Sequence, residues 1–154
     1  MGEPEAIDSA DAGRLRVTRT IEVPELTDEE VRAAVLAALA HGGRARLRVD
    51  VVFVDDPSLA EMHERFLGDP SVTDVMAFDY TESDDEAEHD PQAEIYVSVD
   101  RARVVAKERD ESVRAELRLY LVHGSLHLCG LDDHEEGVRA EMRAAEQLVL
   151  GGLA

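Results

Sequence analysis

Two histidines carry the clearest chemical signal in this sequence. His123 and His127 are four residues apart, so in a helix they project from one face about one turn apart, the separation that two ligands of one small metal ion require. The surrounding segment, residues 117–131, is otherwise almost entirely apolar and is expected to be buried. Buried imidazoles need partners, because an unsatisfied buried polar group costs roughly 1–3 kcal/mol. The pair alone is compatible with a metal site and with two hydrogen-bonded core histidines.

The residues that follow could complete a metal site. Gly130 allows the helix to stop shortly after His127, and His134 follows after six intervening residues. This is a three-ligand zinc pattern, which leaves a fourth position for water and predicts one Zn²⁺ per chain in a catalytic arrangement. Zinc would lower the pKa of that water towards neutrality for hydrolysis. Asp132 or Asp133 could orient a ligand histidine or serve as a ligand itself.

The residue after the first histidine argues against a peptidase. Zinc peptidases carry the pattern HExxH, in which the glutamate acts as general base. The corresponding residue here is Gly124, which cannot accept a proton. Peptide hydrolysis would therefore need a base from elsewhere in the chain.

Hydrophobic periodicity predicts the elements that position these residues. Alternating patterns indicate strands at residues 14–23, 47–54, 73–80 and 93–99. Helical patterns, the first with a capping box formed by Thr27 and Glu30, indicate helices at residues 28–41, 57–67, 100–109, 113–129 and 135–150. We therefore predict one α+β domain, a mixed four-stranded sheet packed with helices, whose central helix carries both histidines to a cleft. Residues 1–13 are expected to be a disordered acidic tail, and residues 14–154 the metal-dependent hydrolase domain.

The composition limits the partners and the compartment. The 154 residues include 16 Lys and Arg against 35 Asp and Glu, a formal charge of −19, which repels polyanions at long range. Ten of the acidic residues lie in the predicted tail and in residues 82–90, so a local basic patch is still compatible with this total. A lone cysteine, Cys129, and the lack of any signal or membrane-spanning pattern predict a cytoplasmic protein with no membrane partner. Ordinary ion pairing is the simplest interpretation of Arg101, Arg103, Arg114 and Arg118.

Three segments resemble one protein family. The run HGSLHLCGLDDH, residues 123–134, resembles the HGxLHLxGxDH signature of the YbeY family, zinc-dependent endoribonucleases of ribosomal RNA maturation. TDVMAF, residues 73–78, is similar to the family's TDVLSF, and EIYVSVDRA, residues 94–102, is similar to its GDIxISxxxA. The resemblance implies a zincin-like fold and single-strand-specific endoribonuclease activity in ribosome maturation and quality control. It also implies small-subunit ribosomal RNA precursor and ribosomal proteins as partners.

This sequence departs from the family pattern at two places. The family has one aspartate before the last histidine, whereas Asp132 and Asp133 stand here and move His134 one place along. We expect His134 to be the third ligand, because imidazole is the family ligand, and Asp133, in the unshifted position, is the alternative. Leu67 stands where many members have an arginine that handles RNA, and Arg65 is the nearby candidate to replace it.

Thr73 and Asp74 are two further candidate residues for the site. By the resemblance, Thr73 and Asp74 are candidates to line the site and face the substrate, although capping of a strand is the commoner role for such residues. One alternative function is a zinc hydrolase of peptides or small molecules. The other is a non-catalytic ribosome-assembly factor with structural zinc.

Overall fold

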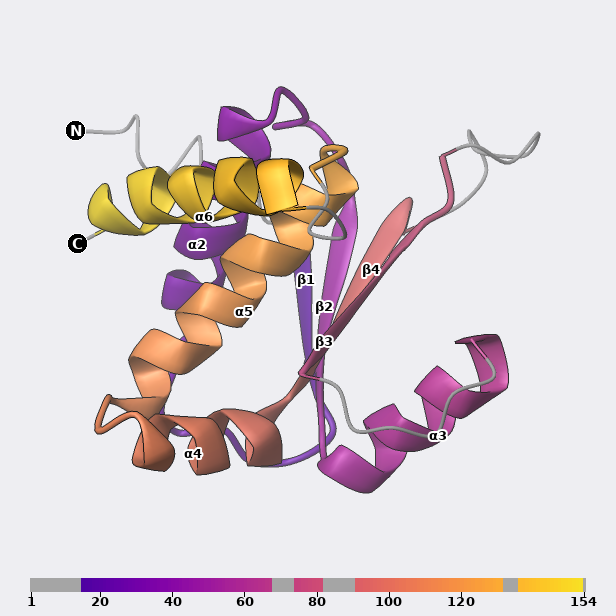
Figure 1. Cartoon of the computed structure of the whole chain (residues 1–154). Helices are drawn as coiled ribbons and strands as arrows, with labels where there is room; N and C mark the ends of the chain where they lie inside the picture. Colours follow the sequence, from indigo (N-terminus) through magenta and orange to yellow (C-terminus); the bar gives the residue numbers. More distant parts are fainter. Residues whose placement is uncertain (1–14, 68–73, 82–90, 132–135, 154) are drawn as a thin grey trace, which may run out of the picture.

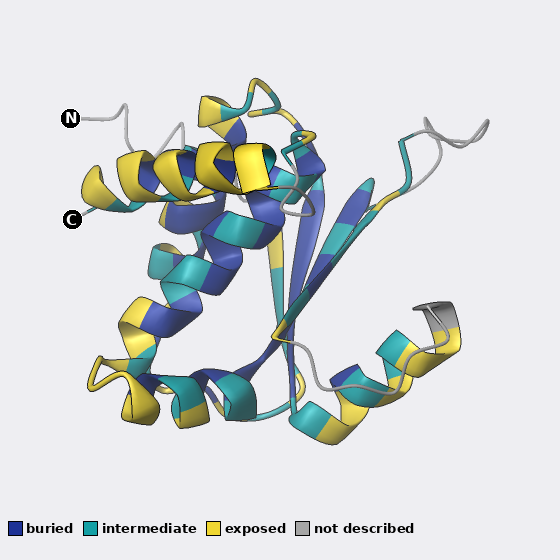
Figure 2. Ribbon diagram, viewed as in Figure 1, coloured by how far each residue is buried: buried dark blue, intermediate teal, exposed yellow. Residues whose placement is uncertain are grey.

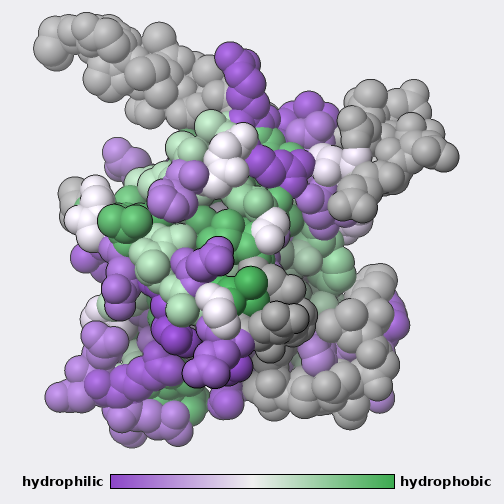
Figure 3. Space-filling model, turned by 45° about the horizontal axis from the view of Figure 1, so that its top comes forward, coloured by the Kyte–Doolittle hydropathy of each residue, from purple (hydrophilic) through white to green (hydrophobic). Residues whose placement is uncertain are grey.

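The computed structural model describes residues 15–67, 74–81, 91–131 and 136–153. The predicted tail, residues 1–13, lies outside them. None of the helices in the described part is long and apolar enough to cross a membrane. On the face in Figure 3, hydrophobic residues gather in the middle and hydrophilic residues dominate the lower part of the view.

Four strands form one mixed sheet, as the sequence predicts (Figure 1). They are β1 (Leu15–Arg19), β2 (Val49–Val54), β3 (Val75–Asp79) and β4 (Ala93–Ser98), in the spatial order β1-β2-β4-β3. The first, second and fourth strands run parallel, whereas β3 is antiparallel to β4. Each strand is shorter than or equal to its predicted segment, because the alternating pattern extends beyond the hydrogen-bonded ladder.

Helices cover both faces of the sheet (Figures 1 and 2). The described helices are α2 (Asp28–His41), α3 (Asp56–Leu67), α4 (Val99–Glu108), α5 (Val113–Leu128) and α6 (Glu136–Gly151). Val51 and Phe53 belong to the main core with α2 and α5, whereas Val52 and Val54 pack with Leu59 of α3. All six residues of β2 are therefore buried, as expected of a central parallel strand covered on both sides.

Helix starts follow their capping residues. The predicted capping box is confirmed: the Glu30 amide donates to Thr27 Oγ1 at 3.1 Å, and the Thr27 amide donates to Glu30 Oε1 at 2.9 Å. The prediction that α4 begins at residue 100 is wrong by one position, since Ser98 is the N-cap and accepts from the Arg101 amide at 3.1 Å. Likewise, α3 starts at Asp56, one residue before the predicted start.

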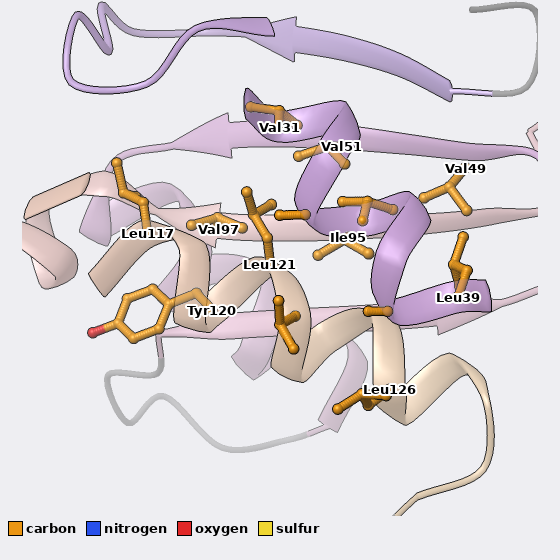
Figure 4. Packing of buried hydrophobic residues seen from close by; sticks show 14 of the residues in the cluster. Val31, Leu39, Val49, Val51, Ile95, Val97, Leu117, Tyr120, Leu121 and Leu126 are labelled. Carbon is orange, nitrogen blue, oxygen red and sulfur yellow. The ribbon is translucent and has the colours of Figure 1, made fainter. Parts of the chain in front are cut away.

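The central helix α5 lies in the core (Figure 4), and it also carries the two histidines. Leu117, Leu121 and Leu126 are completely buried, and they pack with β2, β4 and α2. Its last turn is held by Arg44, whose Nη1 donates to the Leu128 carbonyl at 2.6 Å and to Asp79 Oδ2 at 2.7 Å. This arginine connects the end of α5 with the end of β3, so it fixes the turn that carries the second histidine.

Candidate metal centre and adjoining cavity

A polar stripe runs along one side of α5. Glu116, Tyr120, His123 and His127 recur at intervals of four, three and four residues, which places them on a common helical face. Glu116 is 2% exposed and Tyr120 is 4% exposed, while both histidines are half-buried. The helix that the sequence predicts to be buried therefore carries a row of polar side chains that can bind ligands or protons.

The two histidines lie side by side on successive turns of this stripe. Their ring centroids are 4.7 Å apart and their planes meet at 75°. This is the juxtaposition that the spacing of four predicts. Within residues 15–67, 74–81, 91–131 and 136–153, no three His, Cys, Asp or Glu side chains converge on one metal position. The predicted third ligand His134, together with Asp132 and Asp133, lies outside the described residues, so the three-ligand set stays a prediction.

A carboxylate that the sequence analysis missed holds the first histidine. Glu146 of α6 places its Oε2 2.5 Å from His123 Nδ1, and the two side chains are 12% and 23% exposed. Because the carboxylate engages Nδ1, a metal would bind His123 through Nε2. A signal for Glu146 does exist in the sequence, since it lies on the apolar stripe of α6, four residues after Met142 and three before Val149.

The stripe borders a cavity of about 280 Å³ between α5 and α6. Its lining comes from the start of β3, the end of α4 and the facing sides of α5 and α6: Asp74, Val75, Arg109, Glu116, Leu119, Tyr120, His123, Arg139, Met142, Arg143 and Glu146. Asp74, one of the predicted substrate-facing residues, is thus brought to the site, and its carbonyl also accepts from the Ser98 amide at 3.0 Å. Thr73 lies outside the described residues.

The structure does not bring Arg65 to this cavity. Arg65 is exposed on α3, which packs on the opposite face of the sheet from α5 (Figure 1). The arginines of the cavity instead come from the end of α4 and from α6. Their positions were not predicted, because the packing of α6 and of the end of α4 beside α5 brings them together.

Gly124 allows α5 to approach the sheet closely. A Cβ atom at this position would lie 3.0 Å from Ile95 Cγ2 and 3.2 Å from Val75 Cγ2. Position 124 therefore faces β4 and β3, whereas His123 borders the cavity. A glutamate here, as in HExxH peptidases, would point into the packed core and could not serve as a general base at the histidines.

The contact between Glu146 and His123 gives a testable expectation for metal binding. Replacing Glu146 by alanine should weaken Zn²⁺ affinity about 10- to 100-fold, because the His123 ring loses the partner that orients it. Competition with a chromophoric chelator measures this affinity directly. Glu146→Gln, which keeps an acceptor oxygen, should lose less.

Glu141→Ala is the matched control, since Glu141 is an exposed carboxylate on the same helix. Equal zinc affinities for the Glu146→Ala and Glu141→Ala proteins would contradict the orienting role of Glu146.

The sequence matches one known family over most of its length. The sequence model of the family described as "Endoribonuclease YbeY" matches residues 16–154. The Endoribonuclease YbeY of Phocaeicola vulgatus is 28% identical over 133 residues, which are 86% of this chain and 93% of the relative. That of Porphyromonas gingivalis is 29% identical over 130 residues, with 84% and 83% covered.

The fold also has a counterpart among solved structures. A protein of Thermotoga maritima, determined in solution, superposes with a TM-score of 0.59 at 21% sequence identity, and 89% of each chain is covered. At this identity the likeness concerns the fold alone.

Proposed function

This chain belongs to the YbeY endoribonuclease family, and on that premise we propose that it is a zinc-dependent enzyme that cleaves single-stranded regions of ribosomal RNA. The activity that the family shows is internal cleavage of RNA by hydrolysis. To this family activity the proposal adds three points: zinc as the metal, a preference for single-stranded RNA, and the identity of the substrate. The substrate is the small-subunit ribosomal RNA precursor, cleaved in the cytoplasm during ribosome maturation and quality control, with ribosomal proteins as further partners.

The observation that carries the metal is the histidine pair on α5 with a carboxylate behind it. Two imidazoles on successive turns, one of them held through Nδ1 by Glu146, form the donor set that zinc takes in hydrolases, together with a third protein ligand. We propose His123, His127 and His134 as the ligands of one Zn²⁺ per chain, with Asp133 as the alternative third ligand. A zinc ion at this position supplies a Lewis acid for phosphodiester hydrolysis.

The surrounding chain prepares this position in two ways. Glu146 fixes the His123 ring and its tautomer, and Arg44 fixes the last turn of α5 through the Leu128 carbonyl. The cavity beside His123 provides room for part of a substrate next to the histidines. Preorganised groups of this kind need no rearrangement when substrate binds.

The alternative functions have less support. A zinc peptidase is disfavoured by Gly124, because a side chain at this position would meet Ile95 and Val75 where α5 packs against the sheet. A non-catalytic assembly factor is disfavoured by membership in a family of endoribonucleases.

Metal removal tests the proposed function. We expect protein purified without chelators to contain about one zinc per chain by mass spectrometry and to cleave a labelled single-stranded RNA and a small-subunit ribosomal RNA precursor. Dialysis against a chelator should abolish cleavage, and added Zn²⁺ should restore it while circular dichroism stays unchanged. The same RNA in a perfect duplex, as the matched control, should be cleaved much more slowly.

Two outcomes would contradict the proposal. If protein without bound metal cleaves RNA at the full rate, the proposed requirement for zinc is wrong. If duplex and single-stranded RNA are cleaved at equal rates, the proposed preference for single strands is wrong.

A further inference from the structure

Three arginines surround the cavity beside His123. Arg109 comes from the residue that follows α4, and Arg139 and Arg143 are four residues apart on one side of α6. Three carboxylates share the lining, those of Asp74, Glu116 and Glu146. The formal charges of these six residues cancel, although the whole chain carries −19. The cavity is therefore a locally neutral region on a strongly anionic protein.

The cavity arginines differ from other arginines in their pairing. Arg19, Arg44, Arg103 and Arg114 form ion pairs with Asp28, Asp79, Glu25 and Glu30. For Arg103 and Arg114 this confirms the prediction of ordinary ion pairing. Within the described part of the chain, Arg139 and Arg143 make no ion pair, and both are exposed. Arg109 forms a looser ion pair, with its Nη1 3.6 Å from Glu116 Oε2, beyond hydrogen-bonding distance, and its side chain is 58% exposed.

A buried hydroxyl group in the same cavity lacks a well-formed hydrogen bond. Tyr120 lines the cavity and is only 4% exposed, and its hydroxyl meets no acceptor at full hydrogen-bonding geometry in the described structure, although the Glu116 carboxylate lies near enough to act on its pKa. Figure 4 shows this hydroxyl pointing away from the valine and leucine side chains of the core. Burial, and then the charges of Glu116 and Asp74, raise the pKa of Tyr120 above its usual value, so the group keeps its proton. A buried donor without a well-placed acceptor is costly, which favours a bound ligand that supplies one.

We propose that this cavity binds a backbone phosphate of single-stranded RNA next to the scissile bond, through Arg109, Arg139, Arg143 and the Tyr120 hydroxyl. Guanidinium groups match the geometry of phosphate oxygens and form the stronger, charge-assisted hydrogen bonds. His123 lines the same cavity, so a phosphate held there lies beside the candidate metal position. This inference rests on the proposed function in taking single-stranded RNA as the ligand, but it does not require zinc.

These contacts also explain how an anionic chain can bind an anionic substrate. Beyond about 10 Å, the charge of −19 is largely screened at physiological salt, whereas contacts within the cavity act at short range. Each arginine that contacts a phosphate contributes to the salt dependence of binding, about 0.7 in the slope of log affinity against log salt for a single strand.

Binding of single-stranded RNA to variants of this cavity tests the inference. Fluorescence anisotropy, with a labelled oligonucleotide and protein freed of metal by a chelator, gives dissociation constants without cleavage. We expect Arg139→Gln and Arg143→Gln each to raise the dissociation constant about tenfold and to lower the salt slope by about 0.7. Arg16→Gln is the matched control, because Arg16 is exposed on β1, at the opposite edge of the sheet from β3, and it should change neither quantity.

Tyr120→Phe separates a role in ligand binding from a structural role. Because the hydroxyl makes no well-formed internal hydrogen bond, the variant should keep the thermal stability of the wild type while its RNA affinity falls several-fold. Lowered stability with unchanged affinity would assign the hydroxyl to the fold and remove it from the proposed phosphate site.

The outcomes distinguish this inference from the proposed function. If Arg139→Gln and Arg143→Gln bind RNA as tightly as Arg16→Gln, the phosphate site is refuted, whatever the wild type cleaves. If these variants lose affinity while the wild type shows no zinc-dependent cleavage, the phosphate site stands and the proposed function fails.

Discussion

Replacing His127 by alanine is expected to remove the bound zinc and to reduce RNA cleavage at least about a thousandfold. One of two imidazoles on adjacent turns of α5 is lost, and a metal that stabilises the transition state by several kcal/mol is lost with it. The fold should persist, because His127 is only half-buried at the end of α5 and the last turn is also held by Arg44. Metal content by mass spectrometry, cleavage of a labelled single strand and circular dichroism measure the three quantities.

His41→Ala is the control for this prediction. His41 is exposed in the last turn of α2 and does not line the cavity, so its replacement should leave zinc content and cleavage unchanged. A His127→Ala protein that still carries one zinc and cleaves at the wild-type rate would show that the histidine pair is not the metal site.

The same measurements identify the third ligand. His134→Ala should lose zinc as His127→Ala does, whereas Asp133→Ala should keep most of it. The reverse order would assign the ligand to Asp133, the residue in the unshifted family position.

Introducing a glutamate at position 124 is expected to destabilise the fold by about 3 kcal/mol or more, without creating a peptidase. A Cβ atom there already lies 3.0 Å from Ile95 Cγ2 and 3.2 Å from Val75 Cγ2, so the remaining side-chain atoms have no room. The new carboxylate would also be buried between α5 and the sheet without a partner. Thermal unfolding followed by circular dichroism should show the loss, at about 2–4 °C for each kcal/mol.

Gly137→Glu is the matched control for the change at position 124. Gly137 is exposed in the first turn of α6, no heavy atom of the described residues lies within 4 Å of its Cβ position, and a negative charge is favourable at a helix N-terminus. We expect this variant to be at least as stable as the wild type. A Gly124→Glu protein with equal stability would mean that α5 can move away from the sheet.

Local patterns were sufficient to predict most of the secondary structure. The capping box at Thr27 depends on residues three positions apart, and the histidine pair depends on residues four positions apart, so both can be read from one helix. The antiparallel pairing of β3 with β4 follows from two adjacent alternating segments. The predicted ends of helices and strands were less accurate. At Ser98, for example, the capping side chain ends a strand and starts a helix at the same residue.

The missed residues depend on packing between distant parts of the chain. Glu146 meets His123 only because α6 lies across α5, and Arg109 joins Arg139 and Arg143 only because the end of α4 lies nearby. The hydrophobic periodicity of a single helix or strand cannot predict such contacts between elements. Arg65 illustrates the converse, since its closeness in sequence to Leu67, where many family members have an arginine, placed it among the site candidates, whereas α3 carries it to the other face of the sheet.

The hydrogen bond between Glu146 and His123 has a consequence for the local stability of α6. This helix buries only Met142, Ala145 and Val149, and most of its other side chains are half-buried or exposed. The polar contact adds to the packing of these three side chains in keeping α6 docked, and opening of the helix would release the His123 ring as well. A metal that binds more tightly when Glu146 orients the His123 ring must also stabilise the docked position of α6. The coupling free energy between the two is the same in both directions. A change that makes α6 undock more readily should therefore lower the affinity for the metal, and bound metal should make α6 undock less readily.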